Sequence, residues 1–233
     1  MSETVTWNIG VLLLPFHQLL DWVGPTDYIS NHSQPMVSLL VANFGLPESI
    51  IKKAPIINFH YVSHSLEPVL ASCGPPIHPT VTTADCPHLD YLIIPGPDPY
   101  AKLSDEIDGF IKKLWADPSF KAFLTVCSGS MVIAPTGVLD GHSVCSNKVT
   151  LRDAARKGKL YKGVNWIGDK RWHHDGRVWS AAGVTAGIDL AAAFLAAQLD
   201  KELLDVLEDV AEYSPNPDQP DKFAKILEGV NLN

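Results

Sequence analysis

The stretch Phe123-Leu124-Thr125-Val126-Cys127-Ser128-Gly129-Ser130 decides the fold of this chain. It begins as a short apolar run, which is typical of a buried parallel strand. Small residues follow Cys127, and Met131-Val132-Ile133-Ala134 then restarts the chain as a helix. A nucleophile on such a sharp strand-to-helix turn is held clear of the sheet, which is the geometry of a nucleophile elbow. Unpaired N–H groups at the helix N-terminus would also favour a Cys127 thiolate over the thiol.

A second interpretation of Cys127 is a buried, inert cysteine at a strand end, because free cysteine is among the most buried residue types. The local sequence fits both interpretations, so the rest of the chain has to separate them. The 233 residues, 46% hydrophobic and 19% charged, predict one large globular domain with a substantial core. The net charge of −8 argues against nucleic acid or an anionic membrane as partner, because both need a basic face.

The remaining bulk features indicate a cytoplasmic protein. The N-terminal Met1–Thr4 lacks the pattern of a signal peptide, and no stretch approaches the length of a membrane span. The four cysteines show neither CxxC nor zinc-finger spacing, and the histidines follow no ligand spacing. We therefore expect reduced thiols, no metal and no cofactor, although four cysteines alone are also compatible with disulfides.

Strand-like and helix-like patterns alternate along the chain, which predicts a three-layer α/β/α sandwich with a mainly parallel, flavodoxin-like sheet. We expect a single domain over residues 1–213 and a Pro-rich C-terminal extension over residues 214–233, with a short helix or a loose tail. The expected strands are 5–14, 56–63, 90–94, 123–126, 144–146, 166–173 and 177–181, with a small hairpin over 69–81. The expected helices are 26–30, 104–115, 131–139, one opened by a capping box at 150–153, 184–199 and 202–213; the segment 36–43 fits either a helix or a strand.

Three chemically distinctive sites fall at the carboxyl ends of presumed parallel strands. Asp21 lies in the loop expected after the first strand, Gly96-Pro97 follows Ile94, and Cys127 follows Val126. In open α/β sheets that edge is where ligands bind. This convergence favours the nucleophile interpretation of Cys127.

At this point the sequence resembles the ThiJ/PfpI superfamily, the cysteine-elbow relatives of class I glutamine amidotransferases and of the Parkinson's-disease protein deglycase. The resemblance runs from about Trp7 to Leu199 and combines several motifs. They are Leu12–Phe16 with Leu20–Pro25, Tyr91–Gly96, Val126–Ser130 through Gly137–Gly141, and the late glycine-rich segment Ser180–Asp189. An Asp before Gly-Pro and a small hydroxyl residue after the Cys are most similar to the isonitrile hydratase branch.

Two departures from the superfamily pattern matter for the chemistry. Many members carry a His about twenty residues after the nucleophile, whereas Asn147 stands here and cannot shuttle a proton at neutral pH. The second Gly of the usual turn is Pro97, which has no N–H to offer an oxyanion. Both changes argue against a hydrolytic triad, while the hydratase branch manages without that His.

The resemblance implies a cofactor-independent enzyme that adds water to an isonitrile or a similar small electrophile. Cys127 would attack the terminal carbon to give a thioimidate, Asp21 would carry protons with a pKa raised by burial, and Ser128 would hold developing charge or water. A structural carboxylate at Asp21 and a backbone-only role for Ser128 remain the alternatives. The expected substrate and oxyanion pocket consists of Gly96, Pro97, Gly129, His17, Gly24 and Asn147, with an exposed loop position as the alternative for His17.

Two further functions remain open at this stage: a redox or stress sensor with an exposed, low-pKa cysteine, and a lyase or isomerase acting on a specialised metabolite. We also expect a homodimer. The early loop carries five large apolar residues, which would leave a large hydrophobic patch on a monomer if the loop lay at the surface. They are Phe16, Leu19, Leu20, Trp22 and Val23.

Overall fold

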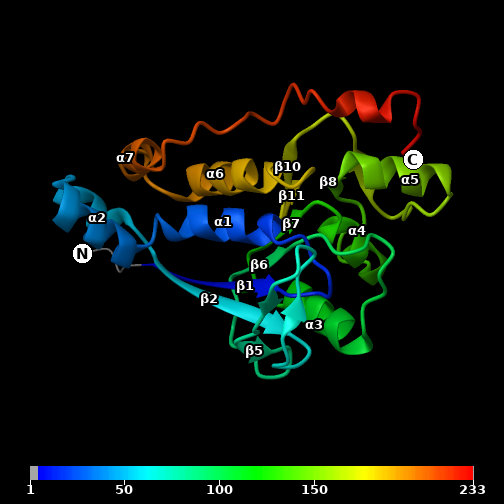
Figure 1. Ribbon diagram of the computed structural model, residues 1–233, viewed down its shortest axis with the longest axis horizontal. Coiled ribbons are helices and arrows are strands. Elements are labelled where there is room, and N and C mark those ends of the chain that lie inside the picture. Colours follow the sequence, from blue (N-terminus) through cyan, green and yellow to red (C-terminus); the bar gives the residue numbers. More distant parts are fainter. Residues whose placement is uncertain (1–4, 233) are drawn as a thin grey trace.

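A seven-stranded sheet organises the computed structural model, which describes residues 5–232 (Figure 1). The strand order is β10-β11-β7-β6-β1-β2-β5, and every neighbouring pair is parallel except β10–β11. The strands are β1 (Thr6–Leu12), β2 (Ile56–Ser63), β5 (Val81–Thr82), β6 (Tyr91–Ile94), β7 (Ala122–Val126), β10 (Trp172–Asp175) and β11 (Val178–Ala181). Two small sheets pair β3 (Val69–Leu70) with β4 (Pro76–Ile77), and β8 (Ser143–Cys145) with β9 (Asn165–Ile167).

Helices cover both faces of the sheet, as expected. The α-helices are α1 (Leu20–Ser30), α2 (Gln34–Phe44), α3 (Asp105–Ala116), α4 (Gly129–Ile133), α5 (Lys148–Arg156), α6 (Ala186–Gln198) and α7 (Lys201–Ala211). The short 3₁₀ helices are η1 (Glu48–Lys53), η2 (Ala134–Thr136) and η3 (Ala224–Leu227). One core packs α1 and α6 against one sheet face, and a second packs α3, α4 and α5 against the other. The three-layer α/β sandwich is therefore confirmed.

The central strands are apolar and buried along their whole length, because helices cover them on both sides. Strands β1, β6 and β7 are direct neighbours, so their carboxyl ends lie at the same edge of the sheet. That edge brings together the segments that carry Asp21, Gly96 and Cys127. Among residues 5–232, no helix is long and apolar enough to cross a membrane.

In the crossover between β1 and β2, one helix begins earlier than the sequence-based prediction and one open assignment is settled. Helix α1 begins at Leu20 rather than near Thr26, so Asp21 lies in its first turn and not in a loop. Pro25 sits inside the helix, which continues because α1 packs against α6, with Gly24 directly beneath Ile188. Tertiary packing here outweighs the helix-breaking tendency of Gly-Pro. The ambiguous segment 36–43 is helical, within α2.

Three later predictions were wrong in detail. The helix after Cys127 ends at Ile133 and continues only as the 3₁₀ turn η2, because Pro135 lacks an N–H donor and Gly137 adopts a left-handed φ of +84°. Helix α5 is capped by Asn147, whose Oδ1 accepts from Val149 N and Thr150 N, and not by a capping box opened at residue 150. Residues 166–173 do not form one strand, since β9 and β10 lie in different sheets.

The segment after α7 runs back across the domain. It passes along α6 and brings η3 beside α5, where Leu227 is buried in the core (Figure 1). Polar contacts fix this path, including hydrogen bonds from Arg171 N to the Asp218 carbonyl (2.8 Å) and from Trp172 Nε1 to the Asn216 carbonyl (3.3 Å). Up to residue 232 the C-terminal segment is therefore an integral part of the structure and not a loose tail.

Candidate active site

Cys127 occupies a tight turn between β7 and α4. Its φ of +57° lies in the left-handed region, which is uncommon for a residue other than glycine and marks local strain. The surrounding chain holds the turn: Cys127 N donates to the Ala181 carbonyl at 3.2 Å, and Ser146 Oγ donates to the Cys127 carbonyl at 2.7 Å. The side chain is only partly buried. The turn thus has the strand-to-helix geometry expected from the sequence.

Two glycines allow the β6 and β7 turns to approach each other. A Cβ on Gly129 would lie 2.2 Å from the Ile94 carbonyl oxygen, and a Cβ on Gly96 would lie 2.5 Å from Ser128 Oγ. Neither position tolerates a side chain without movement of the backbone. Gly96 and Gly129 therefore act as spacers that bring the two strand ends together.

Asp21 reaches the same place from α1. The side chain is fully buried, and its Oδ2 accepts a 2.8 Å hydrogen bond from Gly96 N. The carboxyl group also accepts a hydrogen bond from the Cys127 thiol. Within residues 5–232, the buried Oδ1 makes no hydrogen bond. Burial raises the pKa of Asp21 from 3.8 to about 7, and the hydrogen bonds from Gly96 and Cys127 oppose that rise.

The Cys127 thiol is protonated at neutral pH. Burial raises its pKa to about 11, and the nearby Asp21 charge adds to the rise. Hydrogen bonds from the backbone N–H of Ser128 and from the Asn147 amide lower the pKa of the thiol but do not offset these two effects. The expectation of a low-pKa thiolate was therefore wrong. The five-residue helix α4 contributes too little to outweigh desolvation and a neighbouring carboxylate.

Asn147 links the site to helix α5. Its Oδ1 caps the helix, accepting from Val149 N at 3.0 Å and Thr150 N at 3.3 Å. The amide NH₂ is left to donate, and it bonds to the Cys127 sulfur. Asn147 thus occupies a site position as a fixed donor with no titratable proton.

Ser128 and Pro97 contact each other directly. Ser128 Oγ donates to the Pro97 carbonyl oxygen at 2.6 Å, and both residues are buried. The hydroxyl proton is therefore engaged in holding the β6 turn, while Ser128 N–H faces the sulfur. Pro97 offers the site no N–H, as its residue type requires, and contributes a carbonyl acceptor instead.

Two predicted pocket residues lie beside the site rather than at the sulfur. His17 is fully buried, not exposed, and its Nδ1 donates to the Leu14 carbonyl at 2.8 Å. Its Nε2 is buried and has no partner within residues 5–232, and burial lowers the pKa of the ring, which is therefore neutral. Gly24 allows α1 to pack closely against Ile188 of α6.

Sequence reasoning missed several residues around the site. Gln18 N donates to the Gly96 carbonyl at 2.8 Å and ties the loop before α1 to the β6 turn. The cavity that adjoins Asn147 has a volume of about 250 Å³, and Arg171, Asp221 and Phe223 line it from distant parts of the chain. No local motif marks these three residues, because only the fold brings them together. A larger hollow of about 810 Å³ lies between α3, α4 and the loop after α5, and neither Cys127 nor Asp21 lines it.

This fold and site define a class of α/β proteins with a cysteine at the strand-to-helix turn beside a buried carboxyl group. The chain belongs to the DJ-1/PfpI family, whose model matches residues 44–197. The match includes Gly96, Cys127 and Asn147, whereas Asp21 and the C-terminal segment lie outside the matched residues.

Relatives of known sequence or structure agree with this assignment. An isonitrile hydratase of Pseudomonas putida is 28% identical over 212 residues, covering 90% of this chain and 80% of the relative. The crystal structure of a ThiJ/PfpI family protein from Pseudomonas syringae superposes with a TM-score of 0.70 at 26% identity, covering 92% of this chain and 78% of that one. Drosophila melanogaster DJ-1beta shares the fold, with a TM-score of 0.61 at 15% identity, covering 90% of this chain and 100% of that one.

Proposed function

We propose that this protein is an enzyme that hydrates an isonitrile, or a chemically similar small electrophile, through an adduct on Cys127. The observation that carries the proposal is the buried Asp21 carboxyl group hydrogen-bonded to the Cys127 thiol, with a pKa near neutrality. A group that titrates near 7 can both accept and return a proton at neutral pH. The likeness to an isonitrile hydratase supports the same chemistry.

In the first step the sulfur bonds to the terminal carbon of the isonitrile. The Asp21 carboxylate accepts the thiol proton as that bond forms, which avoids a free thiolate in a site where the thiol pKa is about 11. Protonated Asp21 then delivers the proton to the same carbon. The product is a thioimidate, R–N=CH–S–Cys127, which contains all atoms of the isonitrile and the thiol.

In the second step water adds to the thioimidate carbon. Asp21 accepts a proton from the water and passes it to the imine nitrogen, which gives the tetrahedral adduct HO–CH(NHR)–S–Cys127. Asp21 then takes the proton of the adduct hydroxyl and returns it to the sulfur as the C–S bond breaks and the N-substituted formamide is released. Asn147 and Ser128 N–H are the donors that stabilise charge on the departing sulfur. The net reaction consumes one isonitrile and one water, and these steps need no cofactor.

The redox-sensor alternative is less well supported by the site. Oxidation by peroxide begins with the thiolate, and the raised pKa of Cys127 keeps the thiolate scarce at neutral pH. Intact mass after mild peroxide distinguishes the two functions. Sulfinic acid on Cys127, together with no turnover of any isonitrile, would favour the sensor.

The test of the proposal is incubation with cyclohexyl isocyanide and detection of N-cyclohexylformamide by mass spectrometry. We expect turnover by the wild-type protein and by Cys73→Ala, which removes an exposed cysteine. We expect none by Cys127→Ala. Full turnover by Cys127→Ala would exclude Cys127 as the nucleophile.

A further inference from the structure

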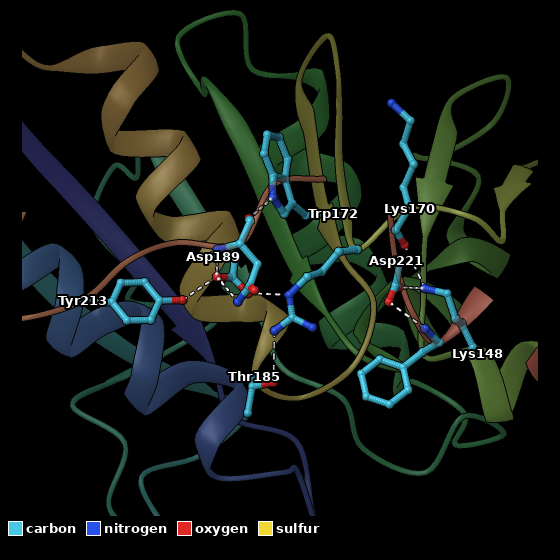
Figure 2. Close-up of polar contacts among 10 residues, drawn as sticks. Lys148, Lys170, Trp172, Thr185, Asp189, Tyr213 and Asp221 are labelled. Carbon is cyan, nitrogen blue, oxygen red and sulfur yellow. Dashed lines mark hydrogen bonds and ion pairs between the residues drawn. The ribbon is translucent and has the colours of Figure 1, made fainter. Parts of the chain in front are cut away.

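A series of polar contacts ties the C-terminal segment to α6, to the loop before β10 and to the start of α5 (Figure 2). The hydroxyl of Tyr213 donates to buried Asp189, and Asn216 N donates to the same carboxylate at 2.7 Å. Further along, Lys170 pairs with Asp218 at 2.8 Å. These contacts fix the path of the segment over the loop between β9 and β10.

A buried ion pair ends this path beside the site. Lys148 Nζ lies 2.5 Å from Asp221 Oδ2, and each side chain is only 3% exposed. Lys148 also donates to the Lys170 carbonyl at 2.8 Å (Figure 2). Because Lys148 directly follows Asn147, the pair anchors the N-terminus of α5 next to the residue that bonds to the Cys127 sulfur. Breaking such a pair on one side leaves an uncompensated buried charge, so we expect its geometry to be well maintained.

The same segment completes one wall of the 250 Å³ cavity that adjoins Asn147. Phe223, 43% exposed, contributes an aromatic surface to the wall, and Asp221 lies in it with its charge matched by Lys148. Residues Ala182–Thr185, directly after β11, also line the cavity. Asn147 is the residue through which the cavity adjoins the candidate site, since Cys127 and Asp21 do not line it.

Arg171 lines this cavity with a guanidinium group of which two nitrogens are hydrogen-bonded. Its Nε donates to Asp189 Oδ2 at 2.5 Å and its Nη2 donates to Thr185 Oγ1 at 3.1 Å. These two hydrogen bonds use Nε and Nη2 and not Nη1, and Arg171 lines the cavity together with Asp221, whose pKa its charge helps to lower. A guanidinium fixed through two of its nitrogens presents the third in a defined direction, which suits recognition of a carboxylate.

We infer that this cavity holds the substituent of the electrophile that reacts with Cys127, and that the substituent is an apolar group ending in a carboxylate. The carboxylate binds Nη1 of Arg171, and Phe223 covers the apolar part. This inference rests on the proposed role of Cys127 as the nucleophile. It names the substrate class as carboxylate-bearing isonitriles and gives the C-terminal segment a part in substrate selection.

The experiment compares alkylation of Cys127 by two probes, N-phenyliodoacetamide and 4-(iodoacetamido)benzoate, which differ only by a carboxylate. Rates follow from intact mass and from peptide mapping of Cys127. We expect the wild-type protein to react about five- to tenfold faster with the carboxylate probe, because a charge-assisted hydrogen bond adds roughly that factor. Arg171→Gln should remove the preference, and Phe223→Ala should slow both probes while keeping their ratio.

Control variants separate this effect from general charge or folding effects. Lys112→Gln removes an exposed cation from α3, on the other face of the sheet, and should keep the preference. If Arg171→Gln misfolds because Asp189 loses its partner, the wild-type ratio of the two probes still decides the question. Equal wild-type rates, or an unchanged ratio in a folded Arg171→Gln protein, would overturn the inference.

The inference and the proposed function can fail separately. If the protein turns over isonitriles but shows no preference for the carboxylate probe, the proposed function stands and the assignment of the cavity is refuted. If Cys127 reacts faster with the carboxylate probe but the protein turns over no isonitrile, the assignment of the cavity stands and the proposed chemistry is refuted. Comparison of isocyanoacetate with its ethyl ester as substrates then shows whether the preference extends to catalysis.

Discussion

The Asp21 carboxyl group accepts a hydrogen bond from the Cys127 thiol, although the two residues lie 106 positions apart in the sequence. One comes from the first turn of α1 and the other from the turn after β7. Their contact depends on the adjacency of β1, β6 and β7 and on the Gly96 N–H, which holds Asp21 Oδ2 at 2.8 Å.

Asp21→Asn should greatly reduce the proposed isonitrile hydration and stabilise the fold at high pH. We expect turnover of cyclohexyl isocyanide to fall by about 10²- to 10⁴-fold, the usual contribution of a general acid–base group. Folded Asp21 keeps its proton up to about pH 7, whereas the unfolded chain loses it near 3.8. Wild-type stability therefore falls as pH rises through that window, and the burial penalty is fully present above pH 7.

Thermal unfolding of both proteins at pH 4 and pH 8 checks this sign. The variant should gain little at pH 4 and up to about 4 kcal/mol at pH 8 relative to wild type. A gain that is the same at both pH values would show that Asp21 is not the titrating group.

Gly96→Ala should damage both stability and activity, because the new Cβ would meet Ser128 Oγ at 2.5 Å and Ser128 N at 2.7 Å. We expect a loss of about 1–3 kcal/mol in the free energy of unfolding. The matched control is Gly109→Ala in α3, where a Cβ meets nothing within 4 Å. That substitution should stabilise the protein by roughly 0.5–1 kcal/mol. Urea denaturation of the two variants provides the comparison, and similar effects would contradict the close-approach argument.

Asp221→Ala should destabilise the protein by about 3 kcal/mol, since it leaves Lys148 charged and buried without its partner. Asp205→Ala breaks the exposed Lys201–Asp205 pair on α7 and should have no resolvable effect. Urea midpoints measure both changes. The rate of Cys127 alkylation should change only in Asp221→Ala, because only that pair anchors the helix that Asn147 caps. Comparable destabilisation by the two substitutions would show that the C-terminal segment is not an integral part of the fold.

We expect a homodimer, and the exposed apolar residues of the structure indicate which surface would form its interface. Trp22 is buried within its own subunit, so it is not an interface residue, whereas Phe16 is 65% exposed and Leu20 39% exposed. Leu70, 48% exposed, lies beside them, since Phe16 N donates to its carbonyl. Light scattering behind a sizing column should report about twice 25.4 kDa.

Phe16→Asn tests that surface, because Asn suits the left-handed φ of +57° at this position and removes the aromatic ring. We expect this variant to dissociate at micromolar concentration. Phe44→Ser removes a ring that is 72% exposed at the end of α2 and should remain dimeric. A wild-type monomer would refute the interface.

Sequence patterns located most of the elements that position the site. The apolar run before Cys127, the run ending at Ile94 and the helix expected over 104–115 each depend on interactions between close neighbours, and the structure has them close to where they were predicted. The strand pattern also predicts that Asp21, Gly96 and Cys127 share one edge, because parallel strands that run the same way end on the same side of the sheet. The predicted starts of α1 and α5 were wrong, since Gly24 packs beneath Ile188 within α1, and Asn147 rather than a capping box at residue 150 caps α5.

What the sequence determined by itself is the set of local elements and the order in which they alternate, because propensity, apolar periodicity and turn residues act over a few positions. Only the tertiary structure decided the protonation of Cys127, since burial and the Asp21 carboxyl group outweigh a short helix that the sequence alone shows. It also decided that Arg171, Asp221 and Phe223 share a cavity next to Asn147. Desolvation and long-range contacts depend on how the chain closes on itself, and no local pattern encodes that closure.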